Sequence, residues 1–143
     1  MKKFLTIVLV IFFLTACSEK TDENYTFVSE SEHWKAEFVY DVSETWGENN
    51  GKRNYSNKEE YTLTFTYKGE ASELATIKNI SYGYDTATRS ESNTIQNTDA
   101  NIKSVFKLAG SSENTARLFP HHAITAYVQW DDFEETFELN NKK

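Results

Sequence analysis

The three histidines of the chain, His33, His121 and His122, are the first candidates for metal chemistry. Zinc takes three or four ligands from elements that converge on one point. His121 and His122 are adjacent and follow Pro120, and neighbouring side chains on an extended chain point to opposite sides. One metal ion therefore rarely uses both. The pattern favours an exposed loop pair, and the sequence assigns no metal ligand.

Four acidic residues near the C-terminus, Asp131, Asp132, Glu134 and Glu135, raise the possibility of a calcium site or a carboxylate pair. Calcium takes six to eight oxygen ligands, usually from alternating positions of a loop that contains glycine. This run has no such loop. A turn followed by a solvated strand face is the simpler interpretation.

The sequence contains no recognisable set of residues for a hydrolase site. A glycosidase needs two carboxyl groups across a sugar-sized cleft, and nothing in the spacing of Glu37, Glu59 and Glu60 selects a pair. The chain has no G-x-S-x-G nucleophile motif and no phosphate-binding glycine loop. The sequence therefore predicts no catalytic residue and no cofactor.

Trp46 and Tyr55 are the best candidates for contact with a ligand or partner. Trp46 precedes a long polar segment, residues 47–58, and Tyr55 lies near its far end. Aromatic side chains on loops stack on sugars or anchor a protein partner. The alternative is that Trp46 folds back over the end of the domain. Trp34 and Trp130 fall in register with apolar neighbours and are predicted core residues.

The only cysteine, Cys17, ends a distinctive N-terminal pattern. Lys2 and Lys3 precede an apolar run from Phe4 to Leu14. That run is too short to span a bilayer of about 30 Å, and it has the length and flanks of a signal peptide. Because the chain has no second cysteine, an internal disulfide is excluded.

The residues Leu14-Thr15-Ala16-Cys17 resemble the lipobox of bacterial lipoproteins, in which an aliphatic residue and two small residues precede a cysteine. The resemblance implies cleavage before Cys17 and a thioether-linked diacylglycerol on its sulfur, and two acyl chains anchor a protein where one does not. We therefore expect residues 1–16 to be a signal peptide. We expect the remainder to be anchored to the cell membrane, facing outside the cytoplasm, in either a Gram-positive or an outer-membrane setting.

The charge balance argues against nucleic acid as a partner. The chain contains 15 Lys and Arg against 22 Asp and Glu, a formal net charge of -7. Loss of Lys2 and Lys3 with a signal peptide leaves 13 basic residues and a net charge of -9. Phosphate backbones and anionic lipid surfaces repel such a domain.

Most of the chain alternates apolar and polar residues, the pattern of half-buried strands. Predicted strands cover residues 33–42, 61–67, 74–84, 100–110, 123–130 and 133–139. The last two form a predicted hairpin closed by Asp131 and Asp132. Its register places Glu135 on the apolar face opposite Val128, which a bulge or a position at the sheet rim would accommodate.

Six strands, or seven with an edge strand near residues 86–89, predict an all-β fold over residues 32–143. The expected architecture is an antiparallel two-sheet sandwich, immunoglobulin-like in its layers only. Two long polar loops are predicted over residues 47–58 and 85–101, and a short helical turn over 112–119.

Residues 17–31 are polar and acidic and predict a flexible tether that spans about 20 Å. The alternative is that this segment adds a short strand to the edge of the sheet, because it contains three larger apolar residues, Tyr25, Phe27 and Val28.

The segments "SESEHWKAEFVYD" and "VQWDDFEETFEL" are similar to those of small lipoproteins from Bacillus-like Gram-positive bacteria, a loose resemblance that transfers no site residue. We expect a non-enzymatic, membrane-tethered binding or accessory module of the cell envelope that meets a protein or a wall polymer. The alternative is a small envelope hydrolase or metal-dependent enzyme that uses His121, His122 and the acidic hairpin.

Overall fold

The computed structural model describes residues 18–97 and 103–142. The predicted signal peptide, Cys17 and residues 98–101 of the second predicted loop lie outside this part of the chain. The elements are β1 (Glu19–Glu30), β2 (Trp34–Asn49), β3 (Lys52–Tyr67), the 3₁₀ helix η1 (Ala71–Thr76), β4 (Asn79–Asp85), β5 (Ser90–Gln96), β6 (Val105–Glu113), β7 (Ile124–Trp130) and β8 (Phe133–Asn141). Within the described residues, no helix has the length and apolar character needed to cross a membrane.

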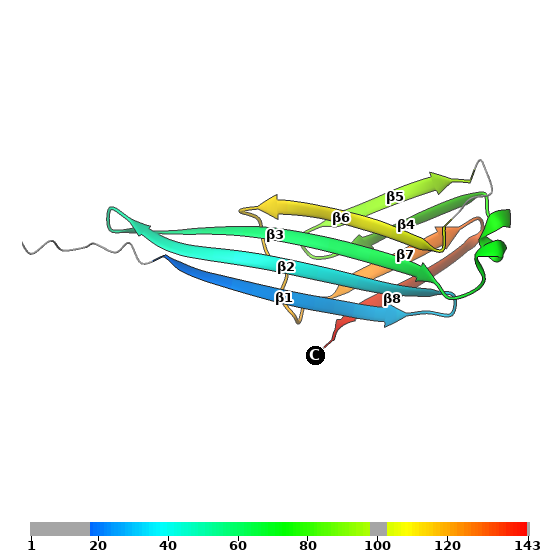
Figure 1. The fold of residues 1–143 in the computed structure, drawn as a ribbon, viewed down its shortest axis with the longest axis horizontal. Helices are drawn as coiled ribbons and strands as arrows, with labels where there is room; N and C mark the ends of the chain where they lie inside the picture. Colours follow the sequence, from blue (N-terminus) through cyan, green and yellow to red (C-terminus); the bar gives the residue numbers. More distant parts are fainter. Residues whose placement is uncertain (1–17, 98–102, 143) are drawn as a thin grey trace, which may run out of the picture.

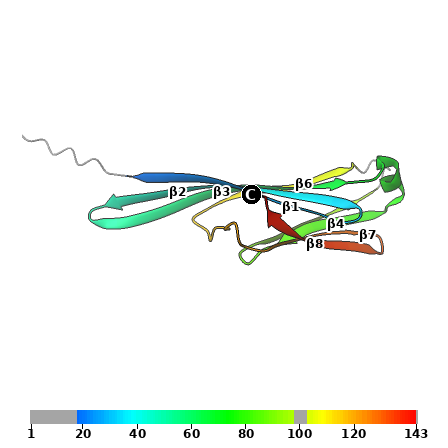
Figure 2. The same ribbon diagram turned by 90° about the horizontal axis from the view of Figure 1, so that it is seen from below.

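All eight strands belong to one antiparallel sheet, in the order β5-β4-β7-β8-β1-β2-β3-β6 (Figure 1). The sheet curls so that the β1-β2-β3-β6 half and the β4-β5-β7-β8 half face each other as two layers (Figure 2). The predicted all-β fold is confirmed. The prediction of six or seven strands in two separate sheets is wrong, because an additional strand, β1, connects the layers.

Residues 19–30 are the strand β1 and not part of the predicted flexible tether, since β1 pairs with β2 along its whole length of twelve residues. Its end, at Phe27 and Val28, also pairs with Asn141 and Asn140 of β8. Phe27 is fully buried and packs edge-on against Phe38. The polar composition of the segment gives little sign of a strand because Phe27 is the one fully buried side chain in it.

The predicted loop over residues 47–58 is also mostly strand. β2 continues to Asn49 and β3 begins at Lys52, so only Asn50 and Gly51 form the turn. Both have positive φ, 51° and 73°, which is the conformation of a two-residue hairpin turn that favours Asn-Gly. The second predicted loop contains β5, which begins just after the expected edge-strand position at residues 86–89.

Two smaller predictions differ from the structure. Residues 71–76 form η1, so the strand predicted from residue 74 begins only at Asn79, although Leu74 is still fully buried. The predicted helical turn over residues 112–119 is wrong, because β6 extends through Glu113 and the six residues that follow it are not helical.

The core lies between the two layers and is largely aromatic. Trp34 is fully buried, and its ring lies 5.1 Å from Tyr67, 5.7 Å from Phe106 and 5.9 Å from Trp130. The core positions predicted for Trp34 and Trp130 are thus confirmed, with Trp130 only partly buried. The predicted C-terminal hairpin is confirmed pair by pair, including Glu135 opposite Val128 with no bulge.

Replacement of Trp34 by Ala should lower the free energy of unfolding by about 3–5 kcal/mol, because the cavity left in the aromatic core cannot collapse fully. Phe133 is 64% exposed and provides a matched control. Phe133→Ala should change the free energy of unfolding by less than about 1 kcal/mol. Urea denaturation followed by circular dichroism measures both. Equal effects of the two substitutions would contradict the assigned core.

Candidate functional site

The β2–β3 hairpin projects beyond the opposite layer, and its inner face is uncovered there (Figure 2). β2 and β3 have 16 residues each, whereas β7 has only seven. On the inner face of β2, the side chains near the middle of the strand are covered by the opposite layer, whereas those near its C-terminal end are not. Trp46 continues the inward register of Tyr40 and Val42, yet it is 48% exposed, while those two are buried.

Trp46 and Tyr55 form a cross-strand pair on this uncovered face. They are direct register partners, their ring centroids are 4.5 Å apart, and Tyr55 is 40% exposed. Glu19, at the start of β1, pairs with Trp46 from the other side. The two residues predicted as a contact site are thus brought together, on a rigid two-stranded ribbon and not on a loop.

Hydrogen bonds hold the Tyr55 ring in place. Its hydroxyl donates to Glu44 Oε1 at 2.6 Å and accepts from Asn57 Nδ2 at 3.0 Å. Asn57 Nδ2 also donates to the carbonyl oxygen of Thr115, at 2.8 Å. Partial burial and the neighbouring Glu44 carboxylate raise the pKa of Tyr55. Tyr55 is therefore a neutral donor at neutral pH, and the aromatic pair is preorganised.

Arg117 connects the β6–β7 loop to the base of this hairpin. Its guanidinium forms ion pairs with Glu23 of β1 and Glu44 of β2 and lies over the Phe119 ring, 4.5 Å from its centre. Burial opposes the charged form, but the two carboxylates outweigh it and raise the pKa of Arg117. Sequence reasoning missed this cluster, because the paired residues are 73 and 94 positions apart and no local pattern marks them.

Glu59 is a buried carboxylate, 1% exposed, inside the same end of the molecule. Its Oε1 accepts hydrogen bonds from Ser112 at 2.5 Å, from Thr115 at 2.8 Å and from the Arg89 guanidinium. The Tyr40 hydroxyl donates to its Oε2. Burial alone would raise the pKa of Glu59, but these donors outweigh it and hold the pKa below its usual value.

The Glu59 cluster joins β2, β3 and β6 to the turn that precedes β5. Because every oxygen is occupied and almost no surface is exposed, the carboxylate is a structural group. Of the other two carboxylates considered from the sequence, Glu60 is exposed and Glu37 is half-buried, both on the opposite face of the sheet.

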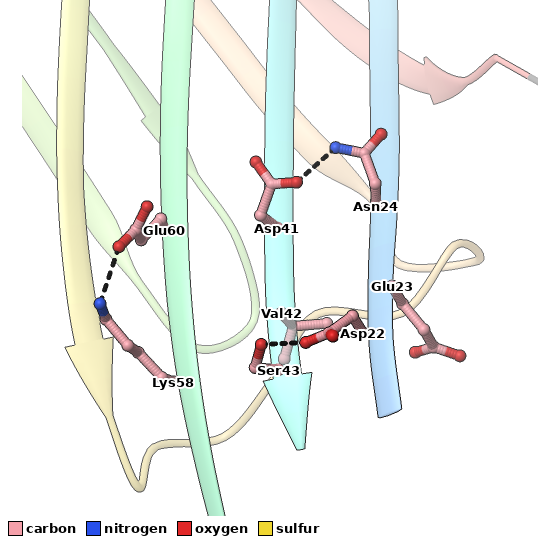
Figure 3. A pocket seen from close by; sticks show the side chains of 8 residues that line it. All are labelled: Asp22, Glu23, Asn24, Asp41, Val42, Ser43, Lys58 and Glu60. Carbon is pink, nitrogen blue, oxygen red and sulfur yellow. Dashed lines mark hydrogen bonds and ion pairs between the residues drawn. The ribbon is translucent and has the colours of Figure 1, made fainter. Parts of the chain in front are cut away.

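The outer face of the sheet carries a pocket of about 330 Å³ over β1, β2 and β3 (Figure 3). Its polar side chains bond mainly to one another: Asn24 Nδ2 donates to Asp41 at 2.6 Å, and Lys58 lies 2.9 Å from Glu60. Mutual pairing of exposed groups is expected of a solvated strand face. The pocket supplies no group aimed at a ligand.

Glu135 pairs with the β1–β2 turn. His33 Nδ1 lies 2.5 Å from Glu135 Oε1, and the backbone N–H of His33 and the Ser31 hydroxyl donate to Oε2. Burial would raise the pKa of Glu135, but these hydrogen bonds hold it below its usual value. This explains how a carboxylate is tolerated beside apolar Val128.

Glu32, His33 and Glu135 could each offer one metal-ligand atom, all within 4.8 Å of one another. Both oxygens of Glu135 are already engaged by the turn, so this cluster is accounted for as a structural contact.

The alternative enzyme site does not assemble as expected. His121 and His122 precede β7, with ring centroids 4.7 Å apart, and pack against Phe119. Asp131 and Asp132 follow the other end of β7, and seven strand residues span about 23 Å. The histidine pair and the acidic turn therefore lie at opposite ends of a strand and cannot hold one metal ion or substrate.

Comparison with known proteins identifies no relative. The chain matches no protein-family description, and no curated protein and no solved structure is significantly similar to it.

Replacement of Glu59 by Gln should lower the free energy of unfolding by about 3–5 kcal/mol at neutral pH, because Arg89 then loses its buried counter-charge. Glu60→Gln, one residue away on the exposed face, should have an effect within about 0.5 kcal/mol. Chemical denaturation of the two variants measures the difference.

The same pair of variants should differ in pH dependence. A carboxyl whose pKa is lowered by folding contributes stability above its unfolded pKa of about 4.3, and this is lost as pH falls through the folded pKa. Below about pH 4 the gap between wild type and Glu59→Gln should therefore narrow, whereas Glu60→Gln should follow wild type. A pH-independent gap would contradict the assigned ionisation of Glu59.

Proposed function

We propose that this protein is a lipid-anchored, extracytoplasmic lipoprotein that acts as a non-enzymatic binding or accessory module of the cell envelope. The exposed Trp46–Tyr55 pair on the projecting hairpin is the observation that carries the binding role. Large aromatic side chains fixed on a rigid element are the residues that dominate contact energies. Here they sit where the ribbon has no covering layer.

The anchor in this proposal is Cys17, on the resemblance of residues 14–17 to a lipobox. A diacylglycerol on this one sulfur supplies two acyl chains, which is enough for stable anchoring in a membrane. The acidic balance of the processed chain argues against nucleic acid as a partner.

The contact surface in this proposal comprises Trp46 and Tyr55 with the polar groups around them. Glu48 and Arg53 pair with each other two register positions beyond the aromatic pair, and with Glu19 they border an open hollow of about 440 Å³. Aromatic rings beside hydrogen-bonding groups suit a protein or a wall polymer. His121 and His122 lie at the opposite end of β7 from Asp131 and Asp132, so these four side chains do not converge on one point.

Replacement of Cys17 by Ser should release the protein from the membrane fraction of the producing bacterium, because the sulfur that accepts the lipid is lost. Ser18→Ala, at the neighbouring position, should leave it membrane-bound. Cell fractionation and mass spectrometry of the N-terminal peptide measure both. A Cys17→Ser protein that remains in the membrane, or a wild-type Cys17 without lipid, would refute the anchor.

A photoreactive phenylalanine analogue at position 55 should cross-link to an envelope component in living cells, and the same analogue at position 133 should not. Trp46→Ala in the same chain should lower the cross-linked yield tenfold or more, the equivalent of about 1.4 kcal/mol of contact energy. Position 133 is the control because Phe133 is exposed but lies at the start of β8, away from the β2–β3 hairpin. Equal yields at both positions would rule out this contact surface.

A further inference from the structure

We infer that the hairpin end contacts the surface of the lipid bilayer itself, with the Trp46–Tyr55 pair and the β2–β3 turn at the level of the headgroups. This inference rests on the proposed function, in which Cys17 carries the lipid. It assigns the exposed aromatic pair to the bilayer surface in place of a protein or a wall polymer.

The length of chain between the anchor and the sheet is the first argument. β1 begins at Glu19, so Ser18 alone separates it from Cys17. Two residues reach at most about 7 Å. The flexible tether predicted from the sequence would have held the domain about 20 Å from the membrane, but twelve residues of that segment pair with β2. The sheet is therefore held close to the lipid.

The direction of the hairpin is the second argument. β1 begins at the same end of the molecule as the β2–β3 turn (Figure 1). Glu19 pairs with Trp46, and β2 continues for three more residues, through Asn49, before the turn. Three residues of antiparallel strand extend about 10 Å. The turn thus reaches at least as far toward the membrane as a fully extended Ser18-Cys17 segment does.

The chemistry of the hairpin end is the third argument. Trp and Tyr have an apolar ring and a polar atom, and they are enriched where lipid meets water. Lys52 and Arg53 follow the turn and are exposed, and basic residues near a membrane surface are attracted to anionic lipids. Residues 46–55 contain Lys52 and Arg53 against Glu48, and Glu19 of β1 lies beside Trp46. Attraction to anionic lipid is therefore confined to the turn, while the domain as a whole is acidic and is repelled by such lipid.

Quenching by lipid tests this contact. The full chain, lipidated by the producing bacterium, would be reconstituted in vesicles of equal parts phosphatidylcholine and phosphatidylglycerol whose acyl chains carry bromine, which quenches nearby tryptophan. Bromine should quench part of the emission of the wild type, and Trp46→Phe should lose that quenched part. Trp130→Phe, which removes a partly buried tryptophan from the opposite end of the sheet, should retain it.

Charge reversal at the turn provides a second variant. Lys52→Glu with Arg53→Glu should reduce the quenching in vesicles that contain phosphatidylglycerol, and should have less effect in vesicles of phosphatidylcholine alone. Near-ultraviolet circular dichroism of each variant establishes that the aromatic core is intact. We expect the near-ultraviolet spectra of the Lys52 and Arg53 variants to match that of the wild type, because these side chains are exposed.

The outcomes separate the two proposals. Lipid on Cys17 together with equal quenching of wild type and Trp46→Phe would overturn the bilayer contact and leave the anchored module standing. Absence of lipid on Cys17 would overturn the proposed function itself. The emission of Trp46 could instead respond to soluble wall polymer, or to an envelope protein recovered by the cross-linking experiment, and not to brominated lipid. That result would assign the hairpin end to that partner and refute the bilayer contact.

Discussion

The pairing of β1 with β2 is the constraint on which the rest of the structure depends. Twelve consecutive residues of β1 lie in register with β2, and the last part of β1 also pairs with β8. Without this strand the two layers would be separate sheets with two additional open edges. Such edges expose unpaired backbone groups. A segment that is mostly polar is therefore held by backbone hydrogen bonds and by a few inward residues, Phe27 above all.

Aromatic packing fills the space between the layers, and two buried ionic clusters close one end of it. Phe38 and Phe65 from one layer meet Tyr84 and Tyr82 from the other, with ring centroids 5.2 Å and 5.7 Å apart. Beyond them, the Glu59 and Arg117 clusters tie the β4–β5 turn and the β6–β7 loop to the long ribbon. Burying a charge is costly unless it is paired and hydrogen-bonded, and each of these charges has both kinds of partner. The loops that end the second layer are thus fastened to the ribbon, and the hairpin projects from a fixed base.

The local predictions that succeeded depend on short-range patterns. The hairpin of β7 and β8 follows from alternation on both sides of a two-residue turn, and its register is as predicted. The core position of Trp34 follows from its parity with apolar neighbours. The predictions that failed concern polar strands: β1, β5 and the outer half of the β2–β3 hairpin carry few apolar residues, so alternation gives little signal there. The Asn-Gly turn at residues 50 and 51 was the one local sign of the long hairpin.

By itself, the sequence determined the all-β class, the register of the C-terminal hairpin and the absence of any possible internal disulfide. These depend on side-chain type and on period-two spacing, which are properties of a local segment. Only the tertiary structure decided that β1 is a strand, that the rings of Trp46 and Tyr55 contact each other across the hairpin, and that Glu59, Arg89 and Arg117 are structural. Those outcomes depend on pairing and burial between residues far apart in the chain. No local pattern contains that information, because the free energy of a polar strand or a buried charge is set by its partner.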